Sequence, residues 1–471
     1  MLHPHASGRR RCGFPTALII GIASILAMTT SNVLTCFGAG GSSAHTTTVV
    51  SVGASFPLHT ESGKRYLIDA AGHPFLIQGD AAWSLIGELK QAEVIRYLDD
   101  RKSRGFNTLL VNLLEHKFST RAPKNAYGDG PFLMVGDFTT PNEGYFAHVD
   151  WVLQRAADRG FLVLLVPAYL GYDGGNEGWY QEMTANGADK LRQYGRYLGQ
   201  RYQRYSNVLW TYGGDFNPPN RTLVEAMANG IREFDTRSLS TAHCGPETAA
   251  MQYWGDEAWL KINNVYTYRP VYIKALEEYR RPEQMPFLLL ESTYENEHDS
   301  TAKLMRTQAY HALLSGAAGQ IFGNNPLWHF SGPGVYSISM TWQQALSSPG
   351  SQSMTHLWKL FTSRNWWQLQ PDASNVVLVG GLGSEQERAV AAVADDRQFA
   401  VAYLPTARTI TMHLDGLAGP LISAEWYDPS SGTYQPASGS PFAASGTQTF
   451  KSPGRSSGGA EDWVLVLNSR Q

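Results

Sequence analysis

Two carboxylic acids in this chain stand at matching places, each at the end of an apolar run that is typical of a buried strand. Asp215 ends the run 207–215 (NVLWTYGGD), and Glu291 ends the run 286–291 (PFLLLE). Parallel barrels carry their catalytic groups at the carboxyl ends of their strands. Hydrolysis of a glycosidic bond needs one carboxyl group as proton donor and a second as nucleophile or base. The pair therefore favours that chemistry, although an isolated strand-end acid more often caps a helix or pairs with an arginine.

The elements that would position these acids alternate between helical and strand patterns. SRGFNTLLVN at 103–112 resembles DRGFLVLLVP at 158–167, and in each a glycine separates an amphipathic helix from a buried strand. Such repeats predict a parallel sheet with right-handed crossovers. An open doubly wound sheet is the alternative, but it would need a glycine-rich phosphate turn after the first strand. We predict an α/β fold, a closed (β/α)8 TIM barrel over residues 57–368, with strands at 74–79, 106–112, 161–167, 207–213, 239–243, 262–268, 286–291 and 319–323.

After Trp366 and Trp367 the pattern changes to short apolar runs separated by turn residues. These runs predict a small antiparallel β-sandwich over residues 369–471. The junction 358–367 is aromatic and has none of the Gly/Ser or Pro runs of a flexible linker. We therefore expect the sandwich to pack tightly against the barrel. Its predicted strands are 376–379, 389–393, 399–403, 409–413, 422–426 and 463–467.

The N-terminus has the pattern of an export signal. Arg9 to Arg11 are basic, residues 16–28 (TALIIGIASILAM) are apolar but too few to span a bilayer, and SSA at 42–44 is a small-x-small cleavage site. We expect residues 1–44 to be a signal peptide and the protein to be periplasmic or extracellular.

Residues 45–56 are small and polar and are interpreted as a linker, and a lipid anchor at Cys36 is the alternative to cleavage near Ala44. Cleavage would leave Cys244 as the one cysteine of the mature chain, which excludes an intrachain disulfide. The net charge of −3 gives no electrostatic reason to expect nucleic acid as a partner. No further apolar run reaches about 18 residues, so we expect no spanning helix in the mature chain.

Other polar and aromatic residues follow the predicted strands, where they would form a polar ring with aromatic walls around a hydroxyl-rich ligand. Ordinary structural roles stay open for them, such as a helix cap for Asp80, a surface position for His116, or core packing for Tyr268 and Trp328. The phenol of Tyr268 lies one strand before Glu291 and could donate a hydrogen bond to it. The candidates for substrate binding are Asp80, Trp83, Asn112, His116, His243, Tyr268, Asn324 and Trp328.

Other chemistries lack their signatures. The sequence has no H-E-x-x-H, G-x-S-x-G, P-loop or G-x-G-x-x-G motif. His243 precedes Cys244, but neighbours on a strand point to opposite faces, so we expect no thiol nucleophile. The acidic loop at 295–299 matches no standard metal spacing and is interpreted as a solvated loop. We expect neither a metal nor an organic cofactor.

Several short phrases stand out in the predicted barrel: GDAAWS at 79–84, RGFN at 104–107, YGGD at 212–215, LEST at 290–293, LSGAAG at 314–319 and GNNP at 323–326. The tail contains WYDP at 426–429 and DWVL at 462–465. Taken together, the barrel phrases resemble the apiosidase-like hydrolases, glycoside hydrolase family 140 and its relatives, and the tail is similar to a small domain often labelled as collagen-binding. The resemblance covers about residues 57–471.

The resemblance implies a (β/α)8 barrel with Asp215 as acid/base and Glu291 as nucleophile. The larger retaining clan has Asn-Glu after strand 4, whereas this chain has Gly214-Asp215, and the side chain of Asp215 is shorter by one methylene. Family members of known activity release apiose from a pectic polysaccharide. We therefore expect an exported, retaining glycoside hydrolase that acts on a plant cell-wall glycan of pectin type. The alternative is a non-catalytic protein that binds glycans or matrix polymers.

Overall fold

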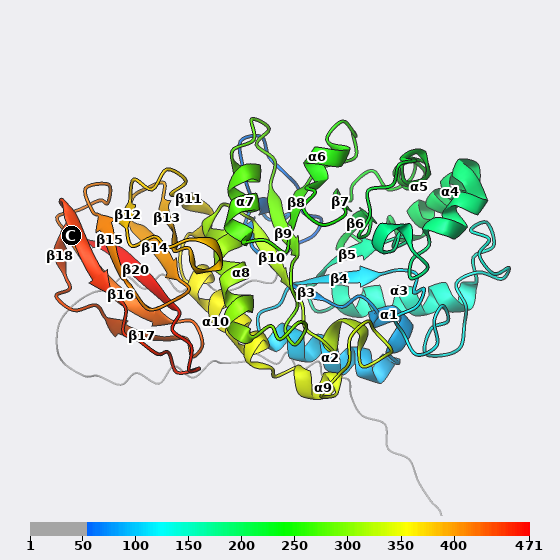
Figure 1. The fold of residues 1–471 in the computed structure, drawn as a ribbon. Coiled ribbons are helices and arrows are strands. Elements are labelled where there is room, and N and C mark those ends of the chain that lie inside the picture. The colour runs from blue at the N-terminus through cyan, green and yellow to red at the C-terminus, as the bar shows by residue number, and fades with distance from the viewer. Residues whose placement is uncertain (1–53) are drawn as a thin grey trace, which may run out of the picture. The chain divides into compact units, whose positions relative to one another are not determined.

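The structure is a computed structural model that describes residues 54–471. The predicted export signal and the alternative at Cys36 lie outside these residues. In the described part, eight parallel strands form a barrel, which confirms the predicted fold class (Figure 1). The ladder order is β7-β6-β5-β4-β3-β10-β9-β8. The strands are β3 (Ile77–Ala81), β4 (Thr108–Asn112), β5 (Leu162–Val166), β6 (Val208–Gly213), β7 (Ser240–His243), β8 (Asn263–Tyr266), β9 (Phe287–Glu291) and β10 (Gly319–Phe322).

The barrel strands bury both of their faces. On β4, Leu109 and Val111 pack toward the helices, whereas Leu110 belongs to the apolar cluster inside the barrel. No helix among residues 54–471 is both long and apolar enough to cross a membrane. The helices are α1 (Leu85–Glu88), α2 (Gln91–Ser103), α3 (Glu143–Ala157), α4 (Tyr180–Tyr202), α5 (Thr222–Arg232), α6 (Ala250–Trp254), α7 (Val271–Tyr279), α8 (Ala302–Leu314), α9 (Trp342–Ala345) and α10 (Pro349–Thr362).

The barrel closes between β7 and β8, the two strands at the ends of the ladder order, through side chains. Asn264 of β8 is fully buried, and its Nδ2 donates to the hydroxyl of Thr241 at 2.9 Å and to the carbonyl of Ala242 at 2.5 Å. The Thr241 hydroxyl in turn donates to the carbonyl of Ile262 at 2.7 Å. Side-chain hydrogen bonds thus satisfy buried polar groups at a seam where the backbone ladder is interrupted.

The C-terminal part forms two antiparallel sheets with a core between them, as the short apolar runs predict. The larger sheet has the order β11-β13-β14-β20-β16-β17, with β18 also paired to β16, and the smaller sheet has the order β12-β15-β19. A short hairpin, β1 (Leu67–Ile68) and β2 (Pro74–Phe75), precedes the barrel. The C-terminal strands are β11 (Leu369–Pro371), β12 (Leu378–Gly380), β13 (Val390–Ala394), β14 (Phe399–Leu404), β15 (Thr409–His413), β16 (Leu421–Asp428), β17 (Thr433–Pro436), β18 (Phe442–Ala443), β19 (Thr447–Lys451) and β20 (Trp463–Arg470).

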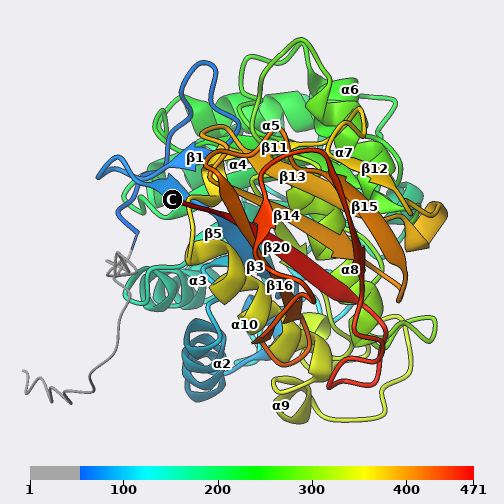
Figure 2. The ribbon, with the colours of Figure 1, turned by 90° about the vertical axis from the view of Figure 1, so that its left-hand side faces the viewer.

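The larger sheet packs against α8 and α10 of the barrel (Figure 2). A buried bidentate ion pair joins the two parts: Arg306 Nε lies 2.6 Å from Asp462 Oδ2, and Arg306 Nη2 lies 2.8 Å from Oδ1. The hydroxyl of Tyr403 also donates to Asp462 Oδ2, at 3.0 Å, and Arg306 Nη1 donates to Ser353 at 3.1 Å. The rings of Tyr310 and Tyr403 stack with centroids 4.6 Å apart. Barrel and sandwich are therefore joined by polar and by aromatic contacts.

Arg306→Met is expected to lower the free energy of unfolding by about 3 kcal/mol, because it leaves the buried Asp462 carboxylate without its cation. Urea denaturation measures the loss. Arg192→Met is the matched control, since it removes an ion pair with Glu233 in which the arginine side chain is 58% exposed. Such surface pairs contribute at most about 1 kcal/mol. Equal losses in the two variants would contradict a stabilising role of the buried pair.

Candidate active site

A left-handed turn at the end of β6 positions Asp215. Gly213 and Gly214 have φ angles of 99° and 135°. A Cβ on Gly213 would lie 2.3 Å from the carbonyl oxygen of His243, and one on Gly214 would lie 2.2 Å from the ring of Tyr169, so both positions require glycine. Asp215 itself has φ 50°, and its backbone N–H donates to His243 Nδ1 at 2.8 Å. Its Oδ2 accepts a hydrogen bond from the Tyr169 hydroxyl at 2.7 Å.

A bulge at the end of β9 positions Glu291. The pairing of β9 with β8 skips Leu290, because Val265 pairs with Leu289 and the next residue of β8 pairs with Glu291. Regular alternation would turn Glu291 to the side of Leu289, which packs toward α7 and α8. The extra residue of the bulge turns the carboxylate inward instead. There Glu291 Oε2 lies 2.6 Å from His243 Nε2.

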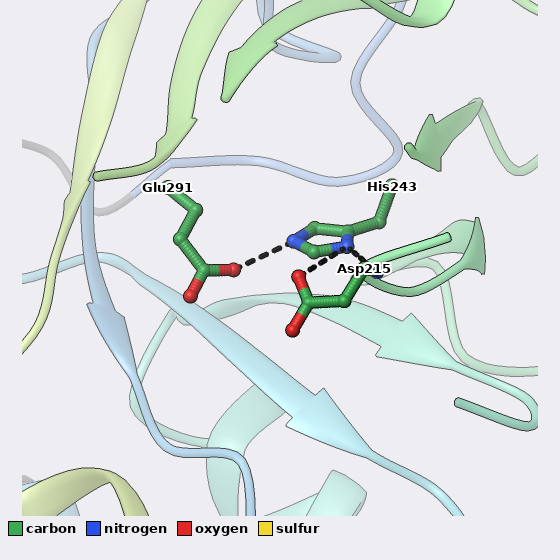
Figure 3. A group of neighbouring side chains, drawn as sticks. All are labelled: Asp215, His243 and Glu291. Carbon is green, nitrogen blue, oxygen red and sulfur yellow. Dashed lines mark hydrogen bonds and ion pairs between the residues drawn. The ribbon is translucent and has the colours of Figure 1, made fainter. Parts of the chain in front are cut away.

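His243, the last residue of β7, lies between the two acids (Figure 3). Its Nδ1 accepts from the backbone N–H of Asp215, so in the neutral ring the proton is on Nε2, which donates to Glu291. One carboxyl oxygen of Asp215 and one of Glu291 lie within 4.8 Å of each other. Two acids and one imidazole thus form a single hydrogen-bonded group, in which Asp215 is partly exposed and the other two residues are buried.

The protonation of His243 is set by opposing effects. Burial lowers the pKa of the ring, whereas the hydrogen bond to Glu291 and the charges of Glu291 and Asp215 raise it, and the net pKa is raised. A second proton on Nδ1 would break the bond from the Asp215 backbone N–H. We therefore assign the neutral form to the ring, because the backbone N–H of Asp215 points at Nδ1 and cannot rotate away from a proton there.

The three residue types are also those of a metal site. Both nitrogens of His243 are engaged, since Nδ1 accepts from a backbone N–H and Nε2 carries the proton donated to Glu291. The neutral imidazole therefore offers no free lone pair to an ion. The hydrogen bonds suit proton transfer and orientation better than metal ligation.

The two acids differ in the donors that reach them. Burial and the charge of Asp215 raise the pKa of Glu291, while hydrogen bonds from His243 and Tyr294 lower it, and the net pKa is raised. Asp215 Oδ1 is buried and has no hydrogen-bond partner in the described residues. That oxygen is therefore free to carry a proton.

Aromatic side chains wall this group. The ring of Trp83 lies 5.6 Å from that of His243 and 5.8 Å from that of Tyr169, between centroids, and its N–H donates to the Tyr294 hydroxyl at 2.9 Å. The ring of Tyr266 lies 5.2 Å from His243 on the other side. The structure thus brings Trp83 and His243, two of the sequence-predicted residues, to the acid pair.

Tyr268 lies at the open end of the same group. Its side chain is half exposed, and its hydroxyl is 2.8 Å from that of Tyr266. The phenol therefore contacts Tyr266, whereas the sequence suggested a hydrogen bond to Glu291. The reason is the strand boundary, because β8 ends at Tyr266. Sequence reasoning placed the end of this strand at residue 268 and missed Tyr266, whose ring lies 5.2 Å from that of His243 between centroids.

Asp80 is not brought to the acid pair. The barrel strand is Ile77–Ala81 and not 74–79, so Asp80 lies within the strand on its outward face. Its Oδ2 accepts from the Tyr97 hydroxyl at 2.7 Å and lies 3.4 Å from Arg101 Nη1, both on α2. Complete burial raises the pKa of Asp80 to about 6 against the lowering effects of Arg101 and Tyr97. Its contacts are those of a structural link between strand and helix.

The remaining predicted residues are spread around the barrel mouth. Asn112 ends β4, and its buried Oδ1 has no partner among the described residues. His116 lies further along the following loop, with Nε2 3.2 Å from Glu182 on α4. Asn324 is fully buried and donates to Glu295 at 2.7 Å, which is a structural contact.

Trp328 belongs to the apolar cluster inside the barrel, and its N–H donates to Glu297 Oε1 at 2.9 Å. The sequence predicted that Glu297 lies in a solvated loop, because no local pattern reveals its hydrogen bond with Trp328. Cys244 is fully buried, and burial raises the pKa of its thiol to about 12, so it has no nucleophilic character.

A cavity of about 470 Å³ lies elsewhere, where the loop at 63–66 and the end of α8 meet the aromatic junction. Its lining includes Tyr66, Trp366 and Trp367 but a single carboxylate, Asp395. One acid does not supply the two carboxyl groups of glycoside hydrolysis. The acid pair at the carboxyl ends of the barrel strands is therefore the candidate active site.

Two family models match the chain. The model described as "Apiosidase-like, catalytic domain" matches residues 61–368, and the model described as "Putative collagen-binding domain of a collagenase" matches residues 371–468. No curated protein has a matching sequence.

Solved structures are similar over most of the chain. A glycoside hydrolase has 24% sequence identity and a TM-score of 0.77, with 88% of this chain and 97% of that chain covered. A glycoside hydrolase family 5 protein from Bacteroides vulgatus has 24% identity and a TM-score of 0.77, with 88% and 92% covered. At this identity the similarity establishes a common fold and leaves the residue roles to the geometry of the site.

Proposed function

This chain belongs to the apiosidase-like family of glycoside hydrolases, and we propose that Asp215 and Glu291 are its two catalytic carboxyl groups. The observation that carries the proposal is their geometry: oxygens of the two acids lie within 4.8 Å of each other, and His243 bonds to both residues. We assign Asp215 as the acid/base and Glu291 as the nucleophile, because Glu291 Oε2 accepts a hydrogen bond from His243 Nε2 at 2.6 Å while Asp215 Oδ1 has no donor among the described residues.

In the first step, protonated Asp215 gives its proton to the glycosidic oxygen as the bond to the anomeric carbon breaks. Glu291 attacks that carbon and forms a glycosyl-enzyme, and the alcohol half of the substrate leaves. The Tyr169 hydroxyl stabilises the Asp215 carboxylate that results. In the second step, Asp215 takes a proton from water, the water oxygen attacks the anomeric carbon, and the bond to Glu291 breaks. His243 and Tyr294 then hold the released carboxylate.

The substrate we propose is a plant cell-wall glycan of pectin type, with apiose as the first candidate product, and the apiosidase-like family supports that choice. Export fits such a substrate, and the N-terminal sequence supports it. The test is incubation with pectic and hemicellulosic oligosaccharides, followed by mass spectrometry of the released monosaccharide. Release of apiose alone would support the finer assignment. Binding without any release would contradict the hydrolytic proposal and favour a non-catalytic glycan-binding protein.

Hydrolysis is expected to retain the anomeric configuration. Retaining enzymes hold their carboxyl groups about 5–5.5 Å apart, whereas inverting enzymes leave about 6.5–9.5 Å for a water molecule. The oxygen pair within 4.8 Å supports the closer class. NMR of the first-formed sugar, recorded before mutarotation, measures the outcome. An inverted product would overturn the assignment of Glu291 as nucleophile and make it a base.

A further inference from the structure

A third carboxylate, Glu297, lies on the loop that follows β9, and the base of this loop is clamped. The neighbouring acid Glu295 is buried and accepts three hydrogen bonds: from Asn324 Nδ2 at 2.7 Å, from the hydroxyl of Ser348 at 2.6 Å and from the backbone N–H of Gly350 at 2.7 Å. Glu295 thus ties the loop to the segments that follow β10. The loop has a fixed starting point directly beyond Glu291.

The backbone around Glu297 is strained. Asn296, His298 and Asp299 have φ angles of 67°, 47° and 60°, although none of them is glycine. Left-handed conformations at such residues cost free energy and persist where the surroundings determine them. The clamp at Glu295 supplies that constraint. The loop therefore holds Glu297 at a defined place and is not a freely solvated segment.

The Glu297 side chain is fixed by an indole. Its Oε1 accepts from Trp328 Nε1 at 2.9 Å, and Trp328 is itself 6% exposed, with its ring packed edge-on against Phe118 at 5.1 Å between centroids. Among residues 54–471, no protein donor reaches the second oxygen, Oε2, and that atom is not buried. Glu297 thus has one oxygen anchored and one free to accept hydrogen bonds.

The surroundings of Glu297 are acidic. Burial raises the pKa of Glu297 to about 7, the Trp328 hydrogen bond lowers it and the charge of Glu291 raises it. Trp328, which holds Glu297, belongs with Tyr294 and Trp83 to the apolar cluster inside the barrel, and the ring of Trp83 lies 5.6 Å from that of His243 between centroids, so Glu297 lies near the acid pair. No lysine or arginine is among the charges that act most on Glu291 or Glu297. The charge that acts on Glu297 is therefore that of another carboxylate, Glu291.

We propose that Glu297 and Trp328 form a subsite that binds a neutral sugar and excludes a sugar carrying a carboxylate. The proposal rests on the proposed function in that Glu291 acts on the sugar held beside this subsite. The free Oε2 accepts hydrogen bonds from sugar hydroxyls, and bonds to a charged acceptor are the stronger kind. The indole N–H of Trp328 holds the other oxygen, Oε1, and so fixes the direction in which Oε2 points. A uronate would bring a further negative charge close to the carboxylates of Glu297 and Glu291. The effective dielectric constant there is lower than in water, so these carboxylates would repel the uronate.

The test measures binding and not turnover, so that it stands apart from the catalytic assignment. Saturation-transfer NMR titrations compare free D-galactose with D-galacturonate and D-glucose with D-glucuronate, at pH 8 and low salt. We expect the neutral member of at least one pair to bind about tenfold more tightly than its uronate. In Glu297→Gln the ratio is expected to fall to about threefold or less. Equal binding of both members, binding of neither, or an unchanged ratio in the variant would overturn the proposal.

Two controls keep the outcome specific. Asp299→Asn removes the same charge from the same loop at an exposed position, and its ratio is expected to equal that of the wild type. If Glu297→Gln does not fold, the wild type alone can test the proposal. A salt concentration of 1 M screens the repulsion and should bring the affinities for the neutral sugar and for its uronate closer together. A ratio insensitive to salt would contradict exclusion by charge. Loss of turnover in Glu291→Gln with continued binding of the neutral sugar would separate the two proposals.

Discussion

Glu291→Gln is expected to lower kcat by at least about a thousandfold while the protein folds normally. The amide has nearly the shape of the carboxylate, and its oxygen can still accept the hydrogen bond from His243 Nε2. It has no negative charge and does not form the glycosyl-enzyme. Single-turnover kinetics on the glycan identified in the oligosaccharide screen measure the loss, and urea denaturation checks folding. Turnover near that of the wild type would remove Glu291 from the mechanism.

Azide distinguishes the roles of the two acids. In Glu291→Ala, azide can enter the vacated space and attack the anomeric carbon from the nucleophile's face, which gives a glycosyl azide of inverted configuration. In Asp215→Ala, azide attacks the glycosyl-enzyme from the other face, which gives a retained product. NMR of the two azides therefore tests which acid is the nucleophile. The reverse pair of configurations would exchange the roles of Asp215 and Glu291.

The barrel could be predicted from the sequence because its strands are buried on both faces and appear as continuous apolar runs. The C-terminal strands that were missed lack this signal. β17 (Thr433–Pro436) is exposed at every residue, and β19 (Thr447–Lys451) buries Phe450 alone. These strands exist because their backbones pair with β16 and β15, a contact that no local pattern contains.

The two acids could be identified as candidates because each ends such a run, but their orientation could not. A bulge aims Glu291 inward against the regular alternation, and a left-handed turn aims Asp215 at His243. Asp80 shows the opposite case. The sequence suggested that it follows the end of a strand, but the strand extends to Ala81, and Asp80 lies within it on the outward face. Alternation decides the face of a side chain only when the strand ends are known to within one residue.

Asp215→Asn is expected to lower turnover according to the leaving group. On an oligosaccharide, whose leaving alcohol needs a proton, we expect a loss in the first step of about a hundredfold to ten-thousandfold. On a dinitrophenyl glycoside of the same sugar the first step should change less than about tenfold, because that phenolate leaves without protonation. The glycosyl-enzyme should then accumulate, since the amide side chain of this variant does not activate water, and a burst of dinitrophenolate should precede slow turnover.

Pre-steady-state kinetics with both substrates measure these losses. Asp256→Asn is the matched control, because Asp256 is 71% exposed and pairs with Arg221 away from the acid pair, so both substrates should react as in the wild type. The geometry explains why the two substrates should respond differently. Asp215 Oδ1 is buried and has no donor in the described residues, and a proton held there can pass to the leaving oxygen of the oligosaccharide. An equal loss on both substrates would mean that Asp215 positions the sugar or His243 and transfers no proton.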